Sequence, residues 1–183
     1  PMLQNRMDEG SLLGMRERRK KAKSLAGTER TPREEAEAKL YTTPKGDPCV
    51  PAKYLISALI AAGVFVRLDG KRQMTTGKTS VVGGVLEVLD HVLPIEPGEW
   101  EVDIQQGRNP NGGEAVCLVR PRFDKWRITA TVVFDNEVLA EKQVRELFDI
   151  AVSRMGFGDF RPSRKGTFGR GVIVGWSVIE EKL

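Results

Sequence analysis

The segment from Gly156 to Gly171, GFGDFRPSRKGTFGRG, combines three kinds of residue that together can hold a phosphate chain. Its five glycines let backbone N–H groups approach a phosphate, and its four cations can neutralise the phosphate charge. Its phenylalanines offer flat faces on which bases can stack. The alternative is a plain connection, with the phenylalanines in the core and the arginines solvated. Because sixteen residues is long for a connection, we predict nucleic-acid contacts from Phe160, Arg161, Arg164, Lys165, Phe168, Gly169 and Arg170.

Two further groups of cations extend this predicted surface. One lies in the polar stretch after residue 66 and the other along the segments 108–125. The alternative interpretation is a set of solvated strand edges, protected from pairing by their charge. As binding candidates we name Lys71, Arg72, Lys78, Arg108, Arg120 and Arg122.

Residues 16–23, RERRKKAK, form a dense basic run. Such a run can hold phosphates or contact a neighbouring subunit. The alternative interpretation is an exposed helix without a partner. Both interpretations stay open at this point.

Catalytic and metal-binding motifs are weak in this chain. The Gly77-Lys78-Thr79 triplet ends like a phosphate-binding loop, but the glycine required five residues earlier is Arg72. His91 is the single histidine and a weak candidate for a general base in RNA cleavage. Cys49 and Cys117 lack metal-ligand spacing, so we expect no metal and no cofactor.

Length and composition describe one globular domain of ordinary size. The chain has 183 residues, a net charge of +4 and 40% apolar residues. Its longest apolar run, residues 54–66, has 13 residues, whereas a membrane span needs about 20. Two distant cysteines suit a reducing compartment. We therefore expect a cytoplasmic protein without a membrane segment.

The first half of the chain predicts two helices and then the start of a sheet. Thr31, Pro32 and Glu34 form a capping box with proline at the first helical position, which predicts a helix over 32–40. Apolar residues at helical spacing predict a second helix from Tyr54 to Gly63. The stretch 64–68 and the β-branched segment 80–95 are typical of strands.

Strict alternation over residues 99–106 predicts a half-buried strand, with Trp100, Val102 and Ile104 on the buried face. Turn residues at 108–113 then predict a hairpin over 99–122.

The last third predicts a strand, a helix, the glycine-rich loop and a closing strand. Alternating apolar residues mark strands over 126–134 and 171–179. A stripe of apolar residues at i, i+3, i+4 and i+7 marks a helix over 140–155 that ends at Gly156.

These elements predict an α+β fold with an RRM-like or ferredoxin-like antiparallel sheet and helices on one face. We divide the chain into a helical, basic N-terminal extension, residues 1–50, and a domain over 51–183. In that domain the hairpin 99–122 is a protruding insertion, and residues 156–171 form the glycine-rich loop.

The order strand, helix, basic loop with a G-x-F-G-R core and strand resembles the repeat-associated (RAMP) superfamily of CRISPR proteins. The resemblance covers residues 120–180 and rests mainly on 156–171. It implies an RRM-like fold, a loop that contacts RNA backbone, copies stacked along the strand and a thumb-like hairpin. The segments RPRFDKW and GFGDFRPSRKGTFGR also resemble proteins from phage and metagenomic genomes.

We therefore predict non-catalytic binding of single-stranded nucleic acid, RNA favoured, by a repeating subunit of a CRISPR-type or phage-encoded ribonucleoprotein assembly. The expected partners are single-stranded RNA or DNA, further copies of the chain and other subunits. Three alternatives remain: a phage protein that binds or anneals single-stranded DNA, a metal-independent endoribonuclease using His91, and a structural or inhibitory phage protein.

Overall fold

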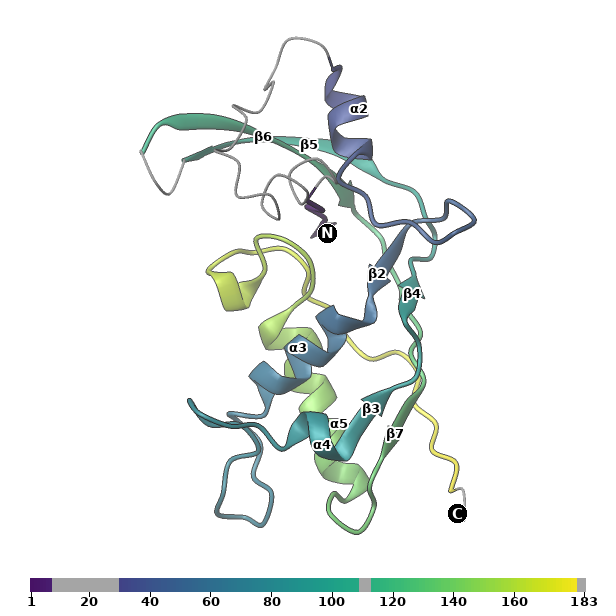
Figure 1. Ribbon diagram of the computed structural model, residues 1–183, viewed down its shortest axis with the longest axis vertical. Helices are drawn as coiled ribbons and strands as arrows, with labels where there is room; N and C mark the ends of the chain where they lie inside the picture. Colours follow the sequence, from purple (N-terminus) through teal and green to yellow (C-terminus); the bar gives the residue numbers. More distant parts are fainter. Residues whose placement is uncertain (8–29, 109–112, 181–183) are drawn as a thin grey trace, which may run out of the picture. The chain divides into compact units, whose positions relative to one another are not determined.

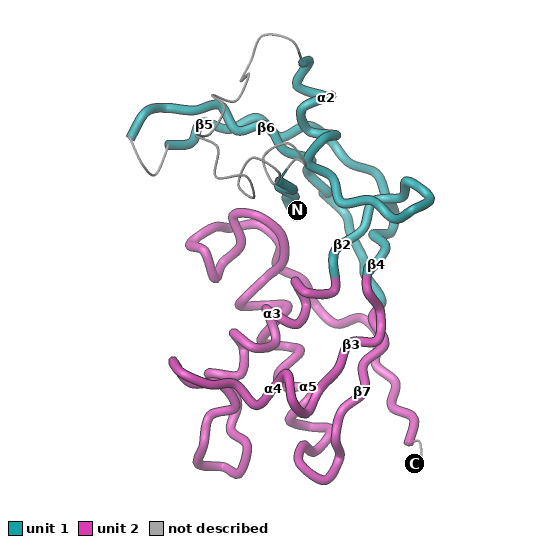
Figure 2. The backbone as a smooth tube through the Cα atoms, viewed as in Figure 1, with its two compact units in different colours: residues 1–51, 92–129 teal, residues 52–91, 130–183 magenta. Residues whose placement is uncertain are grey.

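The computed structural model describes residues 1–7, 30–108 and 113–180, which form a mixed α+β structure with antiparallel sheets. They group into two compact units, residues 1–51 with 92–129 and residues 52–91 with 130–183 (Figure 2). The predicted extension, residues 1–50, thus shares its unit with the predicted hairpin. The basic run 16–23 lies outside the described residues. None of the helices in the described ranges is long and apolar enough to cross a membrane.

The first unit is built on the predicted hairpin (Figure 1). Strand β5, Glu101–Arg108, pairs with β6, Ala115–Phe123, and the short β1, Met2–Leu3, pairs with the other edge of β6. Strand β2, Cys49–Pro51, pairs separately with β4, Val92–Pro94. All of these pairs are antiparallel. The N-terminal segment belongs with the hairpin because β1 completes its sheet.

Helix α2, Pro32–Glu37, confirms the predicted capping box. Thr31 Oγ1 accepts the N–H of Glu34, and the Glu34 carboxylate accepts the N–H of Thr31 at 2.7 Å. The hydrogen bond from the Thr31 backbone is the main reason that the pKa of Glu34 is lowered. On the same helix, Arg33 lies 3.5 Å from the ring centroid of Trp100, which fixes α2 against the start of β5.

The alternation along β5 is present, but the predicted assignment of its faces is wrong. Ile104 is 56% exposed, whereas Asp103 is 6% exposed. The reason is a cross-strand partner that the pattern of β5 alone does not contain. Arg120 lies directly opposite Asp103, pairs with its carboxylate at 3.3 Å and also donates to Gln105 Oε1. Charge neutralisation between the strands allows this polar face to be covered.

The second unit has a helical part and a small sheet. Helix α3, Ala52–Ala62, packs against α5, Glu141–Ile150, and against the π-helical continuation of α5, η1, Ala151–Met155 (Figure 1). The short α4, Val82–Val85, leads into β3, Leu86–Val88, which pairs antiparallel with β7, Val132–Phe134. These helices confirm the two predicted apolar stripes, and the predicted ends at Gly63 and Gly156 are also confirmed.

Several predicted strands differ from the structure. Residues 64–68 form turns with one isolated bridge, Arg67 to Gln73, because the chain reverses after Gly63. The predicted strand 126–134 contains one isolated bridge, from Arg127 to Glu96, and is a strand only in β7. The β-branched segment 80–95 divides into α4, β3 and β4. The described strands form three separate sheets of three, two and two strands. The coarse α+β prediction is therefore confirmed, while the single RRM-like sheet stays a prediction.

The predicted strand 171–179 is wrong, because these residues are in no strand of the described structure. Val172 and Val174 are 80% and 74% exposed. Trp176 attaches the segment to α5 instead: its Nε1 donates to Glu141 Oε1 at 3.0 Å, and its ring meets Phe148 edge-on at 5.5 Å. The contacts of the Trp176 side chain with α5 hold this segment, in place of the backbone hydrogen bonds to a neighbouring strand that the prediction implied.

The buried pair predicts a large cost for removing one partner. Asp103→Asn leaves the Arg120 guanidinium buried beside a neutral side chain, so we expect the free energy of unfolding to fall by about 3–5 kcal/mol. Urea denaturation followed by circular dichroism measures this loss. Glu101→Gln is the matched control, because Glu101 pairs with Arg122 at 2.9 Å but is 70% exposed, and it should cost less than about 1 kcal/mol. Equal effects of the two substitutions would contradict a structural role for the buried pair.

Candidate nucleic-acid interface

The glycine-rich loop, residues 156–171, folds back on itself through its own backbone. The Phe157 N–H donates to the Gly169 carbonyl at 2.9 Å, and the Phe168 N–H donates to the Phe160 carbonyl at 3.2 Å. Between these bonds the short 3-10 helix η2, Pro162–Arg164, turns the chain. The loop is therefore a defined structure attached to the end of η1.

Two glycines are required by the close approach of these backbone segments. Gly169 has a φ of +77°, and a Cβ at this position would overlap the carbonyl of Phe157. A Cβ at Gly166 would overlap the carbonyl of Phe160. Phe160 and Lys165 themselves have φ values of +49° and +62°. Side chains in this backbone region cost conformational free energy, so the loop maintains a strained geometry at two of its predicted site residues.

The three phenylalanines of the loop have two different roles. Phe157 is 1% exposed, which matches the core-filling interpretation. Phe160 is 43% exposed, and its ring centroid lies 6.3 Å from that of the partly exposed Phe168, with the planes tilted by 44°. The loop thus presents a small aromatic surface made by Phe160 and Phe168, which we call the aromatic pair.

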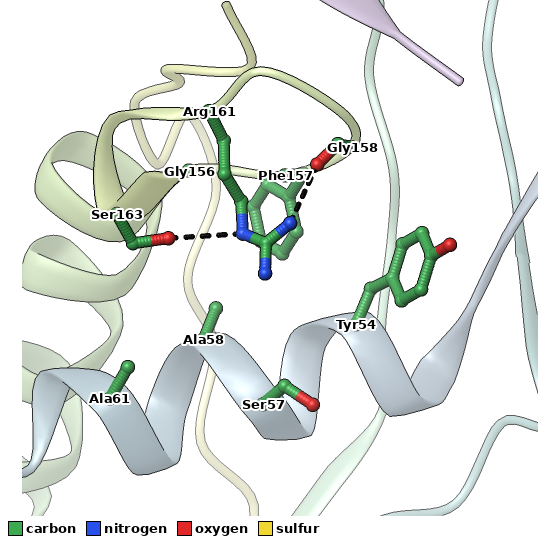
Figure 3. A pocket seen from close by; sticks show the side chains of 9 residues that line it. All are labelled: Tyr54, Ser57, Ala58, Ala61, Gly156, Phe157, Gly158, Arg161 and Ser163. Carbon is green, nitrogen blue, oxygen red and sulfur yellow. Dashed lines mark hydrogen bonds between the residues drawn. The ribbon is translucent and has the colours of Figure 1, made fainter. Parts of the chain in front are cut away.

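The four cations of the loop lie in two different environments. Arg164, Lys165 and Arg170 are exposed, and Arg170 additionally donates to the Ser153 carbonyl at 2.7 Å. Arg161 is turned inward: its Nη1 donates to the Gly158 carbonyl at 2.9 Å and its Nε donates to Ser163 Oγ at 3.0 Å (Figure 3). Three positive charges therefore accompany the aromatic pair, and the fourth faces α3.

The inward-facing guanidinium lines a cavity of about 140 Å³ between the loop and α3 (Figure 3). On the helix side it is bounded by residues at one-turn spacing with mostly small side chains. Its lining residues are Tyr54, Ser57, Ala58, Ala61, Gly156, Phe157, Gly158, Arg161 and Ser163. The sequence prediction missed the four residues from α3. The sequence feature that could have indicated them is the set of small side chains at positions 57, 58 and 61 on one side of an apolar helix.

The predicted cations of the second unit outside the loop form a separate surface. Lys71, Arg72 and Lys78 are all exposed. Arg72 pairs with Asp69 at 2.9 Å, and the hydrogen bonds from Arg72 and Lys71 lower the pKa of Asp69 to about 2. Gln143, in the first turn of α5, binds the carbonyls of Arg67 and Leu68. The glycine-rich loop follows the other end of this helix, roughly 20 Å away at 1.5 Å per residue.

The three predicted cations of the first unit differ in their availability. Arg108 is exposed at the end of β5, next to residues 109–112, which the structure does not describe. Arg122 pairs with Glu101 and Asp124, and the hydrogen bond to Asp124 is the main cause of its raised pKa. Arg120 is 3% exposed and paired with Asp103, so its predicted surface role does not fit its position.

His91 is exposed, and in the described residues its side chain takes part in no hydrogen bond or ion pair. The adjacent Asp90 carboxylate accepts the N–H of Thr131 at 2.7 Å. A general base needs a second acid or a cation to complete RNA cleavage, and no such partner contacts His91 within the described ranges. The same ranges contain no cluster of three metal-binding side chains.

Comparisons with models of protein families, with curated proteins and with solved structures each find no match to this chain. The assignment of a role therefore depends on the geometry of the loop and on the resemblance carried by residues 156–171.

The glycine requirement gives a direct test of the loop. Gly169→Ala places a Cβ against the Phe157 carbonyl at a positive φ, so we expect a loss of about 2 kcal/mol or more in stability. Thermal denaturation measures it. Gly175→Ala is the control, because a Cβ there meets no atom within 4 Å, and it should change stability by less than about 0.5 kcal/mol. If Gly169→Ala melts like the wild type, the loop does not have this backbone structure.

Proposed function

We propose that this chain binds single-stranded nucleic acid without catalysis, through the outer surface of the glycine-rich loop. RNA is the favoured ligand, because the motif of the loop resembles the RNA-contacting loop of the repeat-associated superfamily. The proposal extends to a cytoplasmic, repeating subunit with an RRM-like arrangement, as the same resemblance implies.

The observation that carries the proposal is the aromatic pair, with Phe160 exposed and Phe168 partly exposed, together with three exposed cations on the same short loop. Phe160 is held outward at a strained φ of +49°, and a backbone hydrogen bond ties it to Phe168. A core-forming loop would bury both rings, as it buries Phe157. Stacking on an aromatic ring tolerates any base, and cations beside the ring neutralise the phosphates that connect the bases.

The chemistry of such a surface sets its selectivity. The three cations contact phosphates and not the edges of the bases. The affinity should therefore fall as the salt concentration rises and should depend little on the base sequence. Duplexes hide their base faces in the helical stack, whereas single strands expose them. We therefore expect single strands to bind more tightly than duplex DNA of the same length.

Fluorescence anisotropy of labelled 30-nucleotide single-stranded RNA, single-stranded DNA and duplex DNA tests the proposal at low and at physiological salt. The triple variant Arg164→Gln, Lys165→Gln, Arg170→Gln should weaken binding of the single strands. It should also reduce the slope of log affinity against log salt by about 2, because each contact with a single-stranded phosphate contributes roughly 0.7.

A control for total charge comes from three exposed cations outside the loop and outside the other predicted surfaces, Lys45, Arg127 and Lys142. Their replacement by Gln removes the same three charges and should change the slope much less. Equal effects of the two triple variants would show nonspecific attraction and would contradict the loop as the interface. Preference for single-stranded DNA would favour the phage annealing alternative, and cleavage that persists with chelator but is lost in His91→Ala would favour the endoribonuclease.

A further inference from the structure

The cavity beside the glycine-rich loop has a fixed hydrogen-bond donor. Two of the three nitrogens of the Arg161 guanidinium are engaged within the loop, Nη1 with the Gly158 carbonyl and Nε with Ser163 Oγ. These bonds fix the plane of the group. Within the described residues, Nη2 donates no hydrogen bond, and it points toward the α3 side of the cavity (Figure 3). The cavity therefore presents an oriented N–H donor.

The remaining lining is mainly apolar, with small side chains from α3 and the rings of Tyr54 and Phe157. Ala58 and Ala61 project from α3 toward the loop, and the Phe157 ring and two glycines bound the opposite side (Figure 3). The hydroxyls of Ser57 and Ser163 add polar atoms. A phosphate would bring several charged oxygens into this space, and the alanines and the Phe157 ring offer them no donor. A flat, largely apolar ring with a carbonyl at its edge fits the lining better.

The volume of the cavity limits the size of such a ring. An engineered cavity of about 150 Å³ in another protein takes up one benzene ring, and the cavity here measures about 140 Å³. One six-membered ring therefore fills this space, and the larger fused rings of a purine fit it less well. Among nucleic-acid bases this favours pyrimidines, which share a carbonyl acceptor at position 2.

We infer that this cavity binds one pyrimidine base, unstacked from a single strand that lies over the glycine-rich loop. Arg161 Nη2 donates to the position-2 carbonyl, and Phe157, Ala58 and Ala61 surround the ring. The inference rests on the proposed function and adds a preference to it: a strand held by phosphate contacts and stacking is bound more tightly where a uracil or cytosine can enter.

Fluorescence anisotropy of labelled 15-nucleotide oligouridine, oligocytidine and oligoadenosine tests the inference on the full chain at physiological salt. Oligouridine and oligocytidine should bind about tenfold more tightly than oligoadenosine, because a pyrimidine fills the cavity and accepts a hydrogen bond from the charged Arg161 guanidinium. Ala61→Leu fills the cavity and should reduce this difference to less than about twofold, with the affinity for oligoadenosine unchanged. Ala61→Ser is the matched control, because it leaves the space nearly open and should keep the preference.

Crosslinking of oligouridine that contains 4-thiouridine provides a second readout on the wild-type chain. Adducts on residues 54–61 or 156–163 are expected, and adducts found only elsewhere would contradict the cavity as the base site.

The outcomes separate this inference from the proposed function. Equal binding of the three oligonucleotides, or preference for oligoadenosine, overturns the pyrimidine site and leaves single-strand binding intact. A uniform loss of affinity in Ala61→Leu shows that the cavity receives the sugar or phosphate common to all three, and it also overturns the base assignment. No binding of any oligonucleotide overturns the proposed function, and the pyrimidine site with it.

Discussion

The close approach of two backbone segments inside the glycine-rich loop determines what the loop can present. The hydrogen bond between Phe157 and Gly169 brings the chain so near to itself that a single methyl group at position 169 would overlap a carbonyl. Glycine is the residue that permits this contact at a positive φ. Once the contact is made, the eleven residues between Phe157 and Gly169 are confined, and their side chains are distributed between a buried side and an exposed side.

That distribution connects the loop to two kinds of chemistry. On the exposed side, Phe160 and Phe168 lie among three cations, which suits a flexible polyanion whose bases are accessible. On the buried side, two nitrogens of the Arg161 guanidinium donate hydrogen bonds within the loop, and the third points toward α3. The same arginine therefore stabilises the fold of the loop and lines its cavity. The predicted contact of Arg161 with nucleic acid therefore concerns the cavity side of the loop and not its exposed side.

Local patterns predicted the helices, and pairing between distant segments explains most of the errors. The capping box at Thr31, the stripe over residues 140–155 and the end at Gly63 depend on neighbours a few residues away. The face of β5 depends on Arg120, and the exposed course of residues 172–180 depends on Trp176 meeting α5. Whether a segment forms a strand depends more on such contacts with distant residues than on the intrinsic preference of its own residues. The composition of residues 156–171 was enough to predict the loop as a candidate site. The cavity could not be predicted in this way, because α3, a distant segment, forms one of its sides.

The buried Asp103–Arg120 pair has a consequence for how the hairpin chooses its alignment. The two residues lie directly opposite each other in the observed register, and Ile104 lies opposite Val119. A shift of one residue would turn Asp103 to the other face of the sheet and leave the arginine covered without a counter-charge. Ile104 is 56% exposed, so it contributes less than the ion pair to the choice of register. The ion pair thus favours the observed register of the hairpin over registers shifted by one residue.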